Sequence, residues 1–80
     1  MKQEYRMTQE SLDKLKEEQE YLSTVRMREI TAQIKEALSF GDLSENAEYH
    51  AAKDEQGKVN SRILELETMI SKAVIIAADE

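Results

Sequence analysis

The sequence predicts an all-α fold, a long antiparallel two-helix coiled-coil hairpin with an acidic tip loop. Three observations carry this prediction. The 80 residues include no proline, no cysteine and only two glycines, and 35% of them are charged, which is the composition of long helices. Two stretches repeat apolar residues in steps of three and four, as in the seam of a coiled coil. Gly41 lies between the stretches, so two helices joined there must fold back on each other.

The first helix is expected over about residues 9–40. Thr8 is its candidate N-cap, because Met7 and Leu12 stand where the two residues of a hydrophobic staple belong. The seam residues form two sets: Leu12, Leu15, Gln19 and Leu22, then Met27, Ile30, Ile34 and Ala37. The second set starts five residues after the first one ends. Such a slip rotates the seam or kinks the helix, and we place it in the stretch STVRMR.

The second helix is expected over about residues 45–73, with an unbroken seam. Its apolar steps alternate between four and three along Ala52, Gln56, Val59, Ile63, Leu66, Ile70 and Ala73. Gly57 lies inside this pattern and costs about 1 kcal/mol relative to alanine. Because the shared apolar stripe is narrow, the hairpin alone is expected to be marginally stable, and self-association or a second domain is expected to support it.

The periodicity ends in the stretch AVII, where β-branched residues cluster. We expect this stretch to begin a strand or a linker. The predicted organisation is one coiled-coil domain over residues 1–75, with residues 76–80 starting a linker to a further domain.

Charge and composition exclude several classes of function. The formal net charge of −6 argues against a generic nucleic-acid binder. Without cysteine there is no disulfide or thiolate metal site, which fits a reducing, cytoplasmic environment, and no apolar run is long enough to span a membrane. His50 is the only histidine and is expected on the surface. Because no phosphate loop and no nucleophilic triad are present, we expect no enzyme acting alone.

The tip, residues 41–44 together with the adjacent Glu45, has two interpretations. In the first, Gly41 provides a left-handed turn, and either Asp42 caps the second helix with Glu45 at the third position, or Ser44 caps it with Glu45 in the first turn. This interpretation needs no function. In the second, Asp42 and Glu45 are two exposed carboxylates at the end of a long rod, able to share Mg²⁺ when another molecule supplies the remaining ligands.

The tip stretch GDLSENAEYHAAKDEQ resembles the loop motif of the Gre transcript-cleavage factors of bacteria. The resemblance extends over nearly the whole chain, through MTQESLDKLKEE, VRMREI and SRILELETMISKAVII. It implies an N-terminal coiled-coil domain without the FKBP-like C-terminal domain, which in this family docks on RNA polymerase. Three residues depart from the family pattern. Arg28 replaces a common proline, Gln19 a usually apolar seam residue, and Leu38 a common basic residue near the tip.

The resemblance also implies a function and a site. The coiled coil would enter the secondary channel of bacterial RNA polymerase, where Asp42 and Glu45 would help to hold a second Mg²⁺. That ion would serve hydrolysis of the RNA backbone near the 3′ end of the nascent RNA in a backtracked complex. The chain would then be an activator of the polymerase's own activity, not an enzyme. Four further residues match the motif and would support the tip or touch polymerase or RNA: Ser44, Asn46, Glu48 and Tyr49.

Basic residues along the rod are candidates for facing RNA: Lys35 and Lys53, with Lys58 and Arg62 further back. The alternative is a solvated helix face with local ion pairs, such as Asp54 with Lys58. Two other functions remain open at this point. One is a Gre-like paralogue that enters the channel and inhibits the polymerase, and the other is a structural antiparallel coiled coil whose tip acids only cap a helix.

Overall fold

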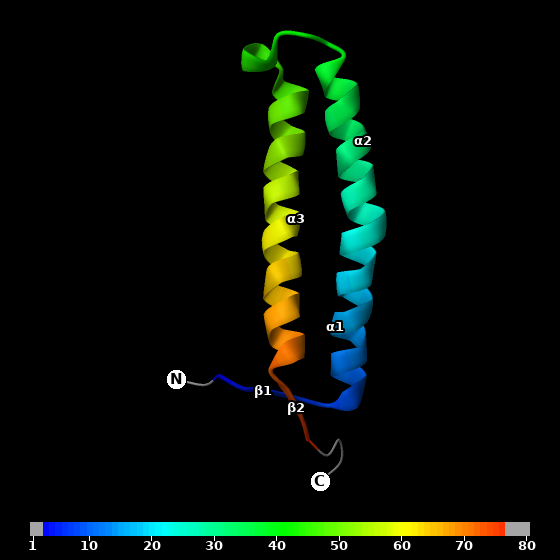
Figure 1. Cartoon of the computed structure of the whole chain (residues 1–80), viewed down its shortest axis with the longest axis vertical. Coiled ribbons are helices and arrows are strands. Elements are labelled where there is room, and N and C mark those ends of the chain that lie inside the picture. Colours follow the sequence, from blue (N-terminus) through cyan, green and yellow to red (C-terminus); the bar gives the residue numbers. More distant parts are fainter. Residues whose placement is uncertain (1–2, 77–80) are drawn as a thin grey trace.

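A computed structural model describes residues 3–76 of the chain, apart from the side chain of Leu43. It is a rod with principal extents of 58 × 27 × 16 Å, and two antiparallel helical arms run side by side along its length (Figure 1). The first arm consists of helix α1 (Gln9–Tyr21), the π-helical turn η1 (Leu22–Arg26) and helix α2 (Met27–Leu38), and the second arm is helix α3 (Ala47–Ser71). The predicted coiled-coil hairpin is confirmed.

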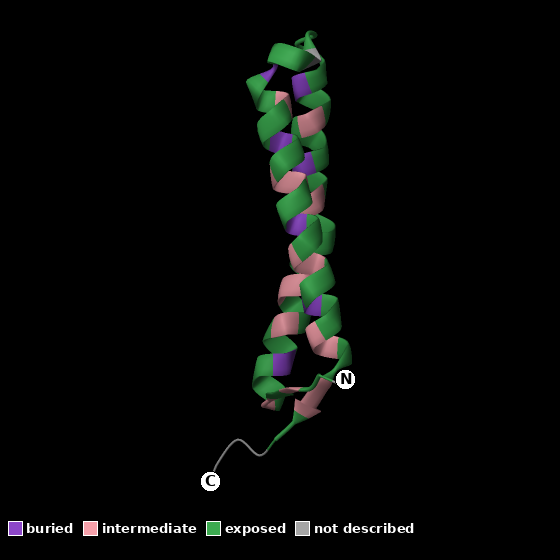
Figure 2. Ribbon diagram, turned by 90° about the vertical axis from the view of Figure 1, so that its left-hand side faces the viewer, coloured by how far each residue is buried: buried purple, intermediate pink, exposed green. Residues whose placement is uncertain are grey.

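The buried residues, purple in Figure 2, are spread along the two arms from the tip to the base. Every residue of the predicted seams is buried or half-buried, and Ile30 and Leu66 are fully enclosed. The buried apolar residues come from all three helices: Leu12, Ile30, Ala37, Ala52, Val59 and Leu66. The spacing of apolar residues therefore gave the correct face of each helix.

Helix α1 begins at the predicted cap. Thr8 has extended backbone angles, and its hydroxyl accepts a hydrogen bond from the Ser11 amide at 3.1 Å. That bond satisfies one of the amide groups that the first turn of a helix leaves without a partner.

The predicted slip of the seam takes the form of the π-helical turn η1. The amide of Met27 donates to the carbonyl of Leu22, five residues back. A π-helical turn accommodates one extra residue without reversing the helix, so the seam residues before and after it both face α3. The five-residue step between the two seam sets thus corresponds to a backbone hydrogen bond between residues five positions apart. No kink is needed, and the helix passes through Arg28 without interruption.

Two arginines tie the arms together, one from each arm. Arg62 of α3 binds Glu18 of α1 with two bonds of 2.9 and 3.1 Å, and Arg26 of η1 reaches Glu55 of α3 at 3.4 Å. Each arginine also binds the glutamate three residues further along its own arm, at 3.0 Å in both cases. The guanidinium of Arg62 holds the pKa of the Glu18 carboxyl below its ordinary value, because it donates hydrogen bonds to the ionised form.

The base of the rod contains two short parallel strands, β1 (Tyr5–Met7) and β2 (Ala73–Ile75). Their register pairs Tyr5 with Ala73 and Met7 with Ile75, and the hairpin itself is the crossover connection that parallel strands require. The expected change to extended structure in AVII is confirmed, whereas β1 was not predicted. Pairing with β1 ends α3 at Ser71, so the expected helix to residue 73 is two residues too long.

The predicted linker begins at Ile76, whose amide donates to the Met7 carbonyl at 2.9 Å. Residues 77–80 lie outside the described part of the chain, and the division into domain and linker at residue 75 stays a prediction. Among the described residues, no helix is both long and apolar enough to cross a membrane.

Candidate functional site

The first arm ends in a tightened turn that directs the chain across the tip. The amides of Ser39, Phe40 and Gly41 donate to carbonyls three residues back, at 3.1 to 3.2 Å, so the α-helical bonding stops at Leu38 and not at the expected residue 40. Gly41 then takes a φ of 90°, as predicted for a left-handed turn that glycine adopts without strain. A short 3₁₀ turn, η2 (Leu43–Glu45), follows.

Asn46 is the N-cap of α3, and the expectation that Asp42 or Ser44 caps this helix is wrong. The Asn46 side-chain oxygen accepts from the Tyr49 amide at 3.0 Å, and its side-chain nitrogen donates to the Ala37 carbonyl at 2.6 Å. The side chain is buried and joins the end of α2 to the start of α3. Helix α3 therefore begins at Ala47, two residues later than expected.

The cap at Asn46 leaves the two tip acids outside the helix. Asp42 and Glu45 are both exposed, and both line one shallow hollow of about 370 Å³ at the tip. The Ser44 hydroxyl donates to one Asp42 oxygen at 2.9 Å. In the described part of the chain, the bonds from a backbone amide to a side chain go to Thr8 and to Asn46, and neither carboxylate accepts one. The helix-cap interpretation thus does not account for these two acids.

The donor set at the tip fits a hard cation only in part. Carboxylate oxygens are the ligands that Mg²⁺ prefers, and Asp42 and Glu45 supply them from one hollow. In the described part of the chain, however, no group of three or more metal-binding side chains occurs. Two carboxylates alone bind Mg²⁺ weakly, so another molecule would have to provide the rest of the coordination shell.

The remaining motif residues lie in the first turn of α3. Tyr49 is half-buried, and its ring packs edge-to-face on His50 with ring centres 5.6 Å apart. The carboxylate of Glu48 is exposed beside the tip. Of the matched residues, Asn46 is thus the one that holds the tip together, and Glu48 is accessible to a partner.

Some of the basic side chains are exposed to solvent, and others bind acidic side chains of the hairpin. Lys35 is exposed on α2, and Lys53 is exposed on α3, where it donates to Gln56 at 3.2 Å. Lys58 makes the predicted pair with Asp54 at 3.3 Å. Arg62 binds Glu18 on the other arm, so its guanidinium is already used within the hairpin, and a role facing RNA stays a prediction. Sequence reasoning missed this bond because the two residues are 44 positions apart.

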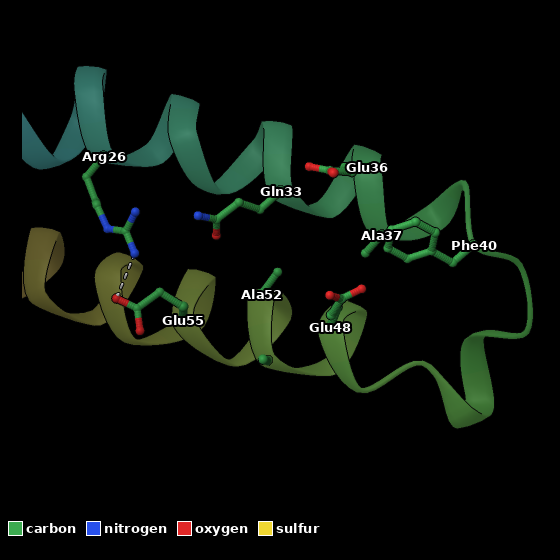
Figure 3. A pocket seen from close by; sticks show the side chains of 9 residues that line it. Arg26, Gln33, Glu36, Ala37, Phe40, Glu48, Ala52 and Glu55 are labelled. Carbon is green, nitrogen blue, oxygen red and sulfur yellow. Dashed lines mark hydrogen bonds and ion pairs between the residues drawn. The ribbon is translucent and has the colours of Figure 1, made fainter.

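A groove next to the tip was also missed in the sequence. It has a volume of about 440 Å³ and runs between α2 and α3 from Arg26 to Phe40. Figure 3 shows its side chains, with Glu36 on α2 and Glu48 on α3. The local signal for it in the sequence is a pair of alanines, Ala37 and Ala52, which occupy the seam positions nearest the tip on the two arms. Small side chains at these positions leave space between the two helices.

Comparison with known proteins gives the family. The family described as "Transcription elongation factor, N-terminal", which GreA and GreB share, matches residues 5–75. The chain belongs to this family. It is 58% identical over 79 residues to the transcription elongation factor GreA of Macrococcus caseolyticus, covering 99% of this chain and 50% of that protein. It is 59% identical over 73 residues to GreA of Clostridioides difficile, covering 91% of this chain and 46% of that protein.

The Gre family assignment covers the hairpin and its base. A further relative, GreA of Geobacillus kaustophilus, is 57% identical over 77 residues, which is 96% of this chain and 49% of that protein. The chain thus spans about half the length of the curated relatives it matches. The match begins at Tyr5 and ends at Ile75, the first residue of β1 and the last of β2. The paired strands therefore belong to the family unit.

Proposed function

We propose that this chain is the arm of a transcription elongation factor that enters the secondary channel of bacterial RNA polymerase and stimulates cleavage of backtracked RNA. In this role the polymerase performs the hydrolysis, and the hairpin brings Asp42 and Glu45 to its active site. The chain contributes side chains to the active site of the polymerase, and it is not an enzyme by itself.

One observation carries the proposal: two exposed carboxylates lie in one hollow at the apex of a rod 58 Å long, in a chain of the Gre family. A thin rod is suited to deliver charge into a narrow channel, where a globular protein of equal mass would not fit. The two arms are held in register by Arg62 and Arg26, so the apex is a defined distance from the base.

The chemistry assigned to each residue follows from its position. A second Mg²⁺ bound at the polymerase would activate a water molecule and stabilise charge on the leaving oxygen. Asp42 and Glu45 would each supply an oxygen ligand to it. Ser44 holds one Asp42 oxygen and so limits the rotation of that carboxylate. Asn46 fixes the backbone from which both acids project.

The test uses a halted, backtracked RNA polymerase complex with labelled RNA. The hairpin is supplied alone and fused to the C-terminal half of GreA from Geobacillus kaustophilus, since the chain covers 49% of that relative. The fusion is expected to shorten the transcript from its 3′ end, and the hairpin alone is expected to do so far more weakly. The Asp42→Asn and Glu45→Gln variants of the fusion should lose at least about 10-fold in cleavage rate, because even the loss of a group that only orients a metal ligand costs about 10- to 100-fold in metal affinity or activity.

Glu67→Gln is the matched control, because Glu67 is an exposed acid on α3 outside the tip hollow. It should cleave as fast as the parent fusion. Cleavage by the double amide variant at the parent rate would overturn the metal-holding role. A fusion that slows elongation and leaves the RNA intact would indicate an inhibitor of the channel. A fusion without any effect on the polymerase would reduce the hairpin to a structural coiled coil.

A further inference from the structure

The groove between α2 and α3 is a second feature near the tip. Asp42 and Glu45 do not line it, whereas Phe40 and Glu48 border both the groove and the tip hollow. Ala37 and Ala52 are buried at its floor, so the two arms approach there with little side-chain volume between them. Arg26 closes the end that lies towards the base, and Phe40 stands at the end beside the tip (Figure 3). The groove is therefore a hollow with an apolar floor, open on one side to solvent.

The walls of this groove carry an excess of negative charge. Its charged lining consists of Arg26 against three glutamates: Glu36, Glu48 and Glu55. Arg26 is already bound to Glu55 at 3.4 Å and to Glu29 at 3.0 Å. Within the described residues, Glu36 and Glu48 have no ion-pair partner on the chain. Two unpaired carboxylates from opposite arms thus border one hollow.

The tip end of the groove carries an exposed aromatic ring. Phe40 is 59% exposed, the most accessible aromatic side chain among the exposed large apolar residues of the described chain, and it borders both this groove and the tip hollow. A ring face in contact with water attracts a cation that lies over it. An apolar floor, two carboxylates and a ring face together match one kind of group: a cation carried on a long alkyl stem.

We propose that this groove receives an arginine side chain from the protein that surrounds the hairpin. The alkyl stem would lie on Ala37 and Ala52, and the guanidinium would bind Glu36 and Glu48 beside the Phe40 ring. Arginine fits better than lysine because its planar group binds carboxylates with two bonds and stacks on aromatic rings. The identification of the partner as RNA polymerase rests on the proposed function. The binding of an arginine in the groove is inferred from the residues of the groove alone.

The first experiment tests the groove by itself, with this chain labelled for amide NMR. The probe is N-acetyl-arginine amide, and N-acetyl-citrulline amide is the control, because it has nearly the same shape without the charge. The arginine probe should give saturable shifts at the amides of Phe40 and Ala52, and citrulline should bind at least five-fold more weakly. Sodium chloride raised from about 0.05 M to about 0.5 M should weaken the arginine binding, since exposed charge pairs are screened.

Paired variants test which carboxylates bind the probe. The Glu36→Gln/Glu48→Gln chain should lose at least five-fold in affinity for the arginine probe. The Glu17→Gln/Glu67→Gln chain loses the same charge from exposed positions outside the groove and should bind as the parent does. Equal binding of citrulline, shifts spread along the whole rod, or full affinity in the first variant would each overturn the proposal.

A second measurement identifies the partner. In the fusion, Glu36→Gln/Glu48→Gln should lower the affinity for core RNA polymerase at least five-fold in a competition assay, and Glu17→Gln/Glu67→Gln should not. If the parent chain binds the arginine probe but the Glu36→Gln/Glu48→Gln fusion binds the polymerase as tightly as the parent fusion, RNA polymerase is not the partner of the groove. The cleavage assay with Asp42→Asn reports on the proposed function separately, because Asp42 does not line the groove.

Discussion

The side-chain nitrogen of Asn46 donates to the carbonyl oxygen of Ala37 at 2.6 Å, from one arm to the other at the tip of the hairpin. The oxygen of the same side chain caps α3 through the Tyr49 amide. The nitrogen of this buried side chain therefore binds the end of α2, and its oxygen binds the start of α3. Neither polar atom of this side chain is left without a partner, although the residue is largely shielded from water, where an unpaired polar atom would be costly.

Replacing Asn46 should therefore destabilise the hairpin more than its exposed surroundings suggest. Asn46→Ala removes a cap worth about 1 kcal/mol and a buried bond of about 1 kcal/mol, so the free energy of unfolding should fall by about 2 kcal/mol. Asn46→Asp keeps the cap but sets a carboxylate against the Ala37 carbonyl, and it should also destabilise. Urea denaturation followed by circular dichroism measures both.

Asn60→Ala is the control for that change, because Asn60 is exposed in the middle of α3. It should alter the free energy of unfolding by less than about 0.5 kcal/mol. If the two alanine variants were equally stable, the tip would not depend on the Asn46 bonds.

The cap at Asn46 marks the boundary of what the sequence could predict at the tip. The apolar spacing placed both arms and all seam residues correctly, because it depends on helical geometry alone. Asp42, Ser44 and Asn46 are all good N-cap residues, and the sequence offered no local reason to prefer one. The choice depends on the Ala37 carbonyl, which lies on the other arm. The exposure of Asp42 and Glu45 follows from that choice.

The base of the rod was predicted only in part for a similar reason. The β-branched residues of AVII indicated extended structure, but Tyr5–Met7 is three residues long and has no pattern of its own. Its strand exists because Ala73–Ile75 lies beside it, 68 positions away in the chain. A contact of that separation is invisible to any local reading of the sequence.

The π-helical turn allows a sharp test by deletion. Removing Ser23, an exposed residue of η1, converts the five-residue step between Leu22 and Met27 into a step of four. The first arm then has the unbroken spacing of α3, so the fold should persist with a stability within about 1 kcal/mol of the parent, because the turn accommodates a single extra residue. Thermal unfolding followed by circular dichroism measures the effect.

Deleting Gln33 is the matched comparison, because Gln33 is an exposed residue of α2 without an extra residue beside it to absorb the change. That deletion rotates Ile34 and Ala37 away from Ile30, out of the seam. It should cost at least about 2 kcal/mol, as expected for lost core contacts. Equal losses from the two deletions would mean that η1 does not absorb a residue.

The two glycines should respond to alanine with opposite signs. Gly41 has a φ of 90°, and Gly57 lies inside α3, while a side-chain carbon at either position would meet no atom within 4 Å. Gly41→Ala should therefore destabilise by about 1 kcal/mol through backbone strain alone. Gly57→Ala should stabilise by about 0.5–1 kcal/mol, because glycine costs that much in a helix. Effects of the same sign in urea denaturation would contradict this account of the tip turn.

The bond between Glu18 and Arg62 should make part of the stability depend on pH. Because Arg62 lowers the pKa of Glu18 in the folded chain from its ordinary 4.5, the pair stabilises the fold above that pH and loses its effect as the pH falls through the lowered value. The side chains are 40% and 38% exposed, so the contribution is about 0.5 kcal/mol.

Glu18→Gln should accordingly lower the melting temperature by about 2–4 °C at pH 7, and the difference from the parent should shrink as the pH falls below 4.5. Salt at about 1 M should also reduce it. Glu10→Gln is the control, because Glu10 lies 3.9 Å from Lys14 on an open surface, where a pair stabilises little at any pH. A gap between parent and Glu18→Gln that stayed constant from pH 7 to pH 3 would show that Glu18 acts through its packing, with its charge making no contribution.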